Sequence, residues 1–417
     1  MLRCLLFLFY LILCTTNSAQ NFESYFVDKT LRLDYILAGS ASEQAIYLSQ
    51  LSAQEHWAGR RNNLDKLPLK GNGQIFVTDL QTQATIYCTS FSTLFQEWIN
   101  TPEALKLSKS FQNTILIPMP KNRANVSVVL FDSYGNEKAK YTHQIDPSDV
   151  LIRRCKKQPS DNVFYTKKSG PYSKCIDIAI LSEGYADVDK KLFDADARLA
   201  TQLLFEHEPF ATYANLFNVV AVYVPSAESG VSIPRNNDWK QTALGAHYST
   251  FYSDRYLTTP NVFAIHDALQ GVDYEHLIIL ANTPEYGGGG IYNSYTLTSS
   301  RHNTFSKVLV HEFGHSFGGL ADEYCYADEV DTLTYPPSVE PWEQNITTQV
   351  DFASKWEKKM DEDGVGLVEG AGYSCKNIYR SAPDCRMRTN ECRTFCKVCT
   401  DAIVKLILFY TEMITQE

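Results

Sequence analysis

The stretch HEFGHSFGGLADEY occupies residues 311–324 and opens with the pattern H-E-x-x-H. Histidines four positions apart lie on one face of a helix, so the imidazoles of His311 and His315 can converge on one tetrahedral Zn²⁺. The carboxylate of Glu312 then lies beside the ion, as a general base requires. A chance match in a core helix is a poor alternative, because histidine is scarce, with 9 in 417 residues. The pattern therefore predicts a zinc hydrolase.

The residues around this pattern favour a helix. Asn303 or Thr304 can cap its start, and Gly318 and Gly319 are expected to end it. Apolar side chains recur between these points at helical spacing. They are Phe305, Val308, Leu309 and Phe313.

Spacing alone leaves more than one candidate for the third metal ligand. Zinc enzymes usually take three protein ligands and leave a fourth position for water. Metzincin peptidases place the third ligand after a glycine, as H-E-x-x-H-x-x-G-x-x-H/D, and a strict count reaches Ala321, which cannot bind a metal. With Gly319 as the pivot the position falls on Asp322, which we favour because it keeps the Gly-x-x-ligand spacing. The alternatives are Glu323 and a downstream glutamate such as Glu340 or Glu343.

Several segments together resemble a known family. HEFGHSFGGLADEY closely resembles the signature HEFGHSFxGLxDEY of the IgA-peptidase-like metallopeptidases, metallopeptidase family sixty-four. The resemblance extends to YGGGG at 286–290, DIAILSEGY at 177–185, SAESG at 226–230 and CRMR at 385–388. It implies a zinc-dependent, metzincin-like endopeptidase, usually preceded by a separate β-rich domain. Glu183 departs from the family, which has aspartate there, and its role stays open.

The resemblance also bears on a methionine and four glycines. Met387 lies where the family would place the methionine of a tight turn below the metal, as an apolar support rather than a chemical participant. Backbone without side chains next to the active-site helix would let an extended substrate lie close and pair with it. A flexible loop is the alternative interpretation. The glycines are Gly287, Gly288, Gly289 and Gly290.

The sequence predicts two domains after the N-terminal segment. Residues 20–150 hold short alternating stretches such as QIFVTD at 74–79, which predict an all-β, sandwich-like N-terminal domain without active-site residue types. The polar residues 151–174 are expected to form a linker. Residues 175–417 alternate between strand and helix patterns, with helices expected at 188–207 and 399–414. This alternation predicts an α/β (α+β) domain, the metzincin-like zinc peptidase.

The N-terminus indicates an exported protein, and the net charge bears on its partners. Arg3, the apolar run at 5–13 and Ala19 predict a signal peptide over residues 1–19, which leads to secretion or to the periplasm. Cys14 raises a lipoprotein alternative, but Leu13 before it is larger than such signals prefer. No other stretch is apolar for long enough to span a membrane. A net charge of −10 indicates no nucleic-acid partner.

The cysteines cluster towards the C-terminus. In an exported protein these are expected to form disulfides, although Cys385, Cys392, Cys396 and Cys399 could instead hold a second, structural zinc. Cys155 and Cys175 bracket the linker and could be joined. The number of cysteines beyond the signal peptide is odd, and the isolated Cys88 is the expected free thiol. Those in the C-terminal group are Cys325, Cys375, Cys385, Cys392, Cys396 and Cys399.

The resulting hypothesis is a zinc peptidase acting on a protein or peptide substrate. Zinc held by His311, His315 and Asp322 would activate a water molecule and polarise the scissile carbonyl, with Glu312 as general base. Tyr324 and Tyr373 are both candidates for stabilising the oxyanion. Two alternatives belong to other classes: a zinc amidohydrolase acting on a glycan or small amide, and a non-catalytic surface-binding protein.

Overall fold

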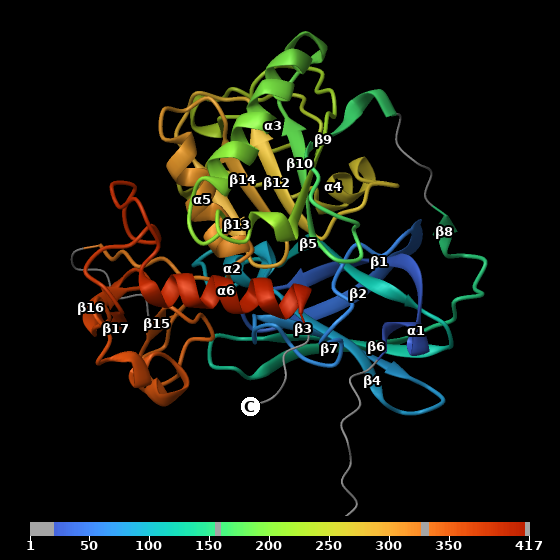
Figure 1. Cartoon of the computed structure of the whole chain (residues 1–417), viewed down its shortest axis with the longest axis horizontal. Coiled ribbons are helices and arrows are strands. Elements are labelled where there is room, and N and C mark those ends of the chain that lie inside the picture. The colour runs from blue at the N-terminus through green and yellow to red at the C-terminus, as the bar shows by residue number, and fades with distance from the viewer. Residues whose placement is uncertain (1–20, 155–159, 327–332, 413–417) are drawn as a thin grey trace, which may run out of the picture.

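The computed structural model describes residues 21–154, 160–326 and 333–412. The expected signal peptide and the possible lipid-bearing Cys14 lie outside these ranges, and so does Cys155 with its expected link to Cys175. No helix in the described ranges is long and apolar enough to cross a bilayer. Figure 1 shows the N-terminal strands in blue on one side and the mixed sheet with its helices in green to orange on the other.

The N-terminal part is β-rich, as predicted. One sheet has the order β5-β1-β2-β8 and the other the order β4-β3-β6-β7. Alternate residues of β1, from Leu31 to Leu37, point into an apolar core shared with Ile75 and Val77 of the second sheet. The elements are α1 (Phe22–Tyr25), β1 (Phe26–Gly39), β2 (Gln44–Glu55), β3 (Gly73–Asp79), β4 (Thr85–Phe91), α2 (Leu94–Trp98), β5 (Lys109–Pro120), β6 (Ala124–Phe131), β7 (Glu137–Ile145) and β8 (Arg153–Arg154).

A mixed sheet of order β13-β14-β12-β10-β11-β9 forms the centre of the second part. β10, β11, β12 and β14 run parallel, while β9 and β13 are antiparallel edge strands. The parallel strands are buried on both faces, which explains their continuous apolar sequence. The bounds are β9 (Val163–Lys167), β10 (Ile176–Glu183), β11 (Phe217–Val222), β12 (His276–Ala281), β13 (Gly288–Ile291) and β14 (Tyr295–Ser299).

Helices cover this sheet unequally. One face packs against α3 (Lys190–Phe205), α5 (Phe305–Ser316) and α6 (Lys397–Thr411) in a single apolar core. The opposite face packs against α4 (Val262–Ala268) and the loops around it. α3 and α6 lie where helices were predicted, although α6 begins at Lys397 rather than at residue 399. The expected end of that helix, residue 414, lies outside the described ranges.

The chain from α5 to α6 is mostly irregular. It contains a small antiparallel sheet of order β15-β17-β16. Its strands are β15 (Ile346–Thr347), β16 (Val368–Ala371) and β17 (Ser374–Arg380). The same segment holds the short 3₁₀ turns η6 (Phe352–Ser354) and η7 (Glu357–Lys359). Those elsewhere in the described residues are η1 (Ser160–Asn162), η2 (Asp187–Asp189), η3 (Ala214–Leu216), η4 (Pro234–Asn236) and η5 (Thr250–Tyr252).

Buried polar contacts join the N-terminal sheets to the central part. On the second face of β1, Arg32 donates to Asp34 at 2.8 Å and to Asp267 of α4 at 2.6 Å. The Arg60 backbone N–H donates to Glu275 at 3.0 Å. Its guanidinium lies 5.0 Å from the ring centre of Phe409 in α6. These charges would be costly to bury unpaired, so they hold the two parts in one arrangement.

The expectation of disulfides is correct for one pair and wrong for others. Cys325 and Cys375 form a disulfide. Cys88 is a buried thiol, as expected. The four remaining cysteines of the C-terminal group, Cys385, Cys392, Cys396 and Cys399, are thiols. Three of them surround a buried carboxylate instead of pairing, as described below.

The glycine run has a packing role that spacing did not predict. β13 lies directly against α5: a Cβ atom at Gly288 would be 2.9 Å from Oε1 of Glu312. On the opposite face, a Cβ atom at Gly289 would be 2.8 Å from the ring of Tyr256. Real Cβ atoms do not approach other atoms so closely, so only glycine permits this spacing of strand and helix.

We expect Gly290→Ala to displace α5. The new Cβ would lie 2.2 Å from the carbonyl oxygen of Glu312 and 2.8 Å from Cβ of His315, neither of which can move without the helix. The free energy of unfolding, measured by urea denaturation, should fall by about 1–3 kcal/mol. Gly366→Ala is the control, because the nearest atom would be 3.7 Å away. A Gly290→Ala protein as stable as this control would contradict the close packing.

Candidate metal centre

Two imidazoles and a carboxylate converge at the end of α5. The Nε2 atoms of His311 and His315 are 3.1 Å apart. Oδ1 of Asp322 is 3.1 Å from the first and 3.3 Å from the second. A tetrahedral zinc with bonds of about 2.0–2.1 Å needs ligand atoms about 3.3 Å apart. These three residues, the His–His–Asp group, therefore fit a zinc ion.

The hydrogen bonds around the imidazoles leave the metal-facing nitrogens free. Nδ1 of His311 lies 2.9 Å from the carbonyl oxygen of Arg386, and Nδ1 of His315 lies 2.6 Å from that of Leu320. A carbonyl only accepts, so each Nδ1 carries a proton and each Nε2 is the nitrogen whose lone pair is available to a metal. This is the tautomer that a metal ligand needs.

Asp322 is held with one oxygen turned towards the histidines. Its Oδ2 accepts a hydrogen bond from the hydroxyl of Tyr373 at 2.6 Å, while its buried Oδ1 has no hydrogen-bond partner. The Cys325–Cys375 disulfide lies beside this contact, and the N–H of Tyr373 donates to the carbonyl of Tyr324. The disulfide therefore helps to place the hydroxyl that orients Asp322.

The carboxyl groups of the site differ in pKa. Burial favours the neutral form of Asp322, but the two imidazoles outweigh it and hold the pKa well below its usual range. Burial raises the pKa of Glu312, and the neighbouring imidazoles only partly oppose this. The site therefore favours the anionic form of Asp322, whereas burial makes Glu312 a stronger base than an exposed carboxylate.

Met387 lies beneath the helix. It is fully buried, and a Cβ atom at Gly314 would be 2.7 Å from its sulfur, so glycine between the histidines permits the contact. The N–H groups of Arg388 and Thr389 both donate to the carbonyl of Cys385, which closes a tight turn. The carbonyl of Met387 accepts from the N–H of Glu323 at 2.8 Å. The turn thus contacts both α5 and the segment that carries Asp322.

Helix α5 ends before the glycine reversal that the sequence predicted, but the predicted side-chain cap at its start is absent. The N–H of Gly319 donates to the carbonyl of His315, and Gly319 has a φ of +57°, in the region that favours glycine. This reversal turns the chain back towards Asp322. Thr304 occupies the cap position, but its hydroxyl lies against Nδ1 of His302 and caps no helical N–H.

The alternative third ligands lie elsewhere. The Glu323 carboxylate accepts from Asn345 at 3.0 Å, within a different cluster. Glu340 accepts from Thr348, and Glu343 from Tyr335. Glu183, whose role the sequence left open, accepts from the N–H groups of Leu244 and Ala246 and so anchors a loop. Among the residues that the structure describes, none of these four carboxylates belongs to the His–His–Asp group.

A cleft of about 770 Å³ opens onto the histidines. Gly288, Gly289 and Gly290 line it, whereas Gly287 does not and instead lies against Tyr248. The other walls include the aromatic side chains Tyr324, Tyr335, Trp342 and Tyr373. A cleft of this size, with both aromatic and charged side chains in its walls, can hold several residues of an extended peptide.

The N-terminal part forms one wall of this cleft, which sequence reasoning missed. Gln96 and Glu97 of α2 line it. The hydroxyl of Tyr256 donates to Glu97, and burial raises the pKa of this carboxyl to about 7. The N-terminal part, in which no active-site residue type was expected, therefore contributes a carboxyl group to the cleft. No local pattern marked α2, because its position depends on how the two parts pack.

The site combines the His–His–Asp group with the carboxylate of Glu312 at the same cleft. This combination is typical of a hydrolase metal site. The family model described as IgA Peptidase M64 matches residues 165–364, and the one described as Peptidase M64 N-terminus matches residues 21–142. The chain belongs to the M64 peptidase family and is a metallopeptidase. A search of curated proteins finds no match.

We expect Tyr373→Phe to weaken metal binding. The change removes the hydrogen bond that fixes Oδ2 of Asp322, and loss of such a contact typically lowers metal affinity about 10- to 100-fold. Competition with a chromophoric chelator measures the affinity. Tyr326→Phe is the control, because that hydroxyl contacts Arg255 and not Asp322. Equal zinc affinities for the two variants would remove Tyr373 from this role.

Proposed function

We propose that the chain is an exported, zinc-dependent, metzincin-like endopeptidase that hydrolyses extracellular proteins. His311, His315 and Asp322 would hold the zinc, and Glu312 would be the general base. The observation that carries the proposal is the convergence of the three ligand atoms within 3.1–3.3 Å at the cleft. The turn around Met387 beneath α5 supports the metzincin-like assignment. Membership of a peptidase family favours this function over an amidohydrolase or a binding protein.

The proposed reaction divides the work between the metal and the side chains. Bound zinc would supply a Lewis acid that polarises the scissile carbonyl and acidifies a water molecule. Glu312 takes the proton of the attacking water and returns it to the departing amine, which its raised pKa favours. The hydroxyl of Tyr373 is committed to Asp322. Tyr324 is therefore the better candidate for the oxyanion, since its hydroxyl accepts from Arg255 and can still donate.

The substrate would lie along β13 as an extended strand. Gly287, Gly288, Gly289 and Gly290 belong to the proposed substrate edge, and β13 is an edge strand beside α5. Leu257 already donates to the carbonyl of Gly288, so added backbone pairing is expected beyond that point. Glu97 would face the substrate from the N-terminal wall. The family description mentions immunoglobulin A, and immunoglobulin A is therefore a reasonable first substrate to test.

The proposal includes the domain limits and the export. The signal peptide would be residues 1–19, the N-terminal β-sandwich domain residues 20–150, the linker residues 151–174 and the catalytic domain residues 175–417. The disulfide Cys325–Cys375 is typical of an oxidising compartment and supports secretion or a periplasmic location. Strand β8, within the proposed linker, pairs with β2. The first residues of the linker are therefore still attached to the N-terminal sheet.

We expect Glu312→Gln to abolish peptidase activity without loss of zinc. The amide cannot accept the proton, so kcat should fall by at least about 10²–10⁴-fold, while the His–His–Asp group is unchanged. Cleavage of casein and immunoglobulin A, with and without chelator, measures activity, and elemental analysis measures zinc. Glu391→Gln is the control, an exposed carboxyl on the same cleft that should leave activity near wild type. Hydrolysis retained by Glu312→Gln would refute its assigned role.

A further inference from the structure

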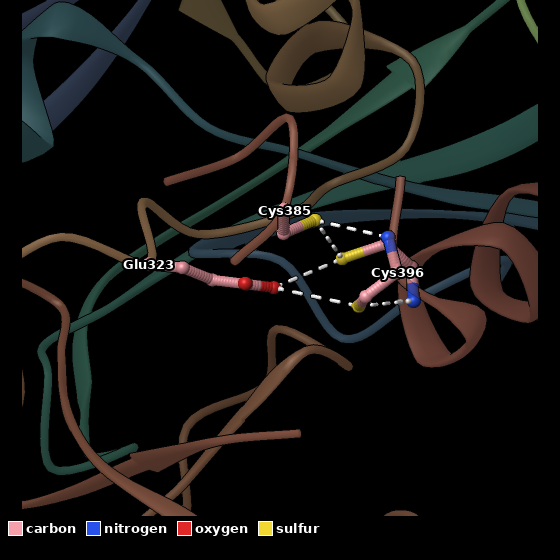
Figure 2. Close-up of side chains that lie close together, drawn as sticks. Glu323, Cys385 and Cys396 are labelled. Atoms are coloured by element: carbon pink, nitrogen blue, oxygen red, sulfur yellow. Dashed lines mark hydrogen bonds between the residues drawn. The ribbon is translucent and has the colours of Figure 1, made fainter. Parts of the chain in front are cut away.

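A second group of metal-binding side chains is buried behind the first. We call it the Cys₃Glu cluster, and it consists of Glu323, Cys385, Cys396 and Cys399. All four residues are buried, and one ligand atom from each lies within 4.8 Å of the others. Figure 2 shows the sulfur atoms of Cys385 and Cys396 and the carboxylate of Glu323 turned towards one another.

The distance between two of the sulfurs and one of the two sulfur–oxygen distances are close to those of a tetrahedral thiolate site, and the other sulfur–oxygen distance is shorter. Zinc–sulfur bonds of about 2.3 Å place two sulfurs about 3.8 Å apart and a sulfur and an oxygen about 3.6 Å apart. The sulfurs of Cys385 and Cys399 are 3.8 Å apart. Oε1 of Glu323 is 3.0 Å from the sulfur of Cys399 and 3.9 Å from that of Cys396.

The backbone around the cluster is arranged for sulfur anions. The sulfur of Cys385 accepts from the N–H groups of Cys396 at 3.1 Å and Met387 at 3.5 Å. The sulfur of Cys396 caps the start of α6 by accepting from the N–H of Cys399 at 3.4 Å. Such N–H donors, together with the positive end of a helix, favour the thiolate over the thiol.

The carboxylate supplies an independent sign that something is bound. Oε1 of Glu323 accepts from Nδ2 of Asn345 at 3.0 Å. Its buried Oε2 has no hydrogen-bond partner. An unpaired buried oxygen is destabilising, and a metal ion bound to this carboxylate would offset that cost. A disulfide between Cys385 and Cys399 would satisfy two sulfurs and leave this oxygen and the third sulfur as they are.

We propose that the Cys₃Glu cluster binds a second zinc ion with a structural role. Three sulfurs and one carboxylate complete a tetrahedral shell, with no position left for water or substrate. The site is also buried away from the cleft, whose lining contains none of its four residues. Binding releases the thiol protons and forms zinc–thiolate bonds, so no oxidant is required.

This zinc would join the segments that position the first site. Glu323 directly follows Asp322, and Cys385 belongs to the turn whose Arg386 carbonyl accepts from His311. Cys396 and Cys399 fix the start of α6 to both segments. This consequence rests on the proposed function, whereas the existence of the second site does not.

Metal analysis of the full chain, purified in the presence of zinc, tests the proposal. We expect two zinc ions per chain in the wild type and one in Cys399→Ser. Cys392→Ser is the matched control and should keep both ions. Its sulfur lies in the same segment but contacts the carbonyl of Thr394, outside the cluster. Wild-type protein with one zinc that survives Cys399→Ser would overturn the proposal.

Cobalt substitution separates this proposal from the proposed function. Cobalt bound to thiolates gives an intense near-ultraviolet charge-transfer band, whereas the His–His–Asp group contains no sulfur. We expect His315→Ala to lose one metal ion and peptidase activity but to keep this band. Absence of the band from cobalt-loaded wild type would refute the Cys₃Glu site and leave the peptidase unaffected.

Thiol mapping provides a test that needs no variant. In the native wild type, Cys385, Cys396 and Cys399 should resist alkylation until a chelator and a denaturant are both added, and they should then all react. A disulfide between Cys385 and Cys399, found by mass spectrometry under non-reducing conditions, would contradict the proposal. This result decides the question even if Cys399→Ser fails to fold.

Discussion

The contact between the turn at residues 385–388 and helix α5 is the constraint on which the metal centre depends. The carbonyl of Arg386 fixes the tautomer of His311. The side chain of Met387 fills the space that Gly314 leaves. The carbonyl of Met387 holds the backbone at Glu323, next to Asp322. Without this turn, the helix would still carry two histidines. The orientation of His311 and the position of the third ligand, Asp322, would no longer be fixed.

The close approach of β13 to the opposite side of α5 is the matching constraint. Its glycines bring the edge strand close enough for backbone to form one wall of the cleft. α2 of the N-terminal part forms another wall, held there by contacts such as Ser92 N–H to the carbonyl of Tyr292. The cleft is therefore a property of the whole chain, and the N-terminal part is more than an appended module.

The sequence predicted what depends on local spacing. Two histidines on one helix, a glycine reversal and an aspartate after it lie within 14 residues, so the pattern alone brought them together. It could not predict Glu97 at the cleft or Tyr373 on Asp322, because these contacts depend on tertiary packing across long separations. It also favoured disulfides where the structure has thiols, since spacing does not reveal which sulfurs face a carboxylate.

The order of these parts along the chain has a consequence for synthesis. The helix with its histidines is made first, and Arg386 follows His311 only 75 residues later, with Met387 and the start of α6 after it. A growing chain therefore carries the catalytic pattern while lacking the groups that orient it. In the proposed enzyme, activity would therefore arise only after this later segment has been made and has packed against the helix.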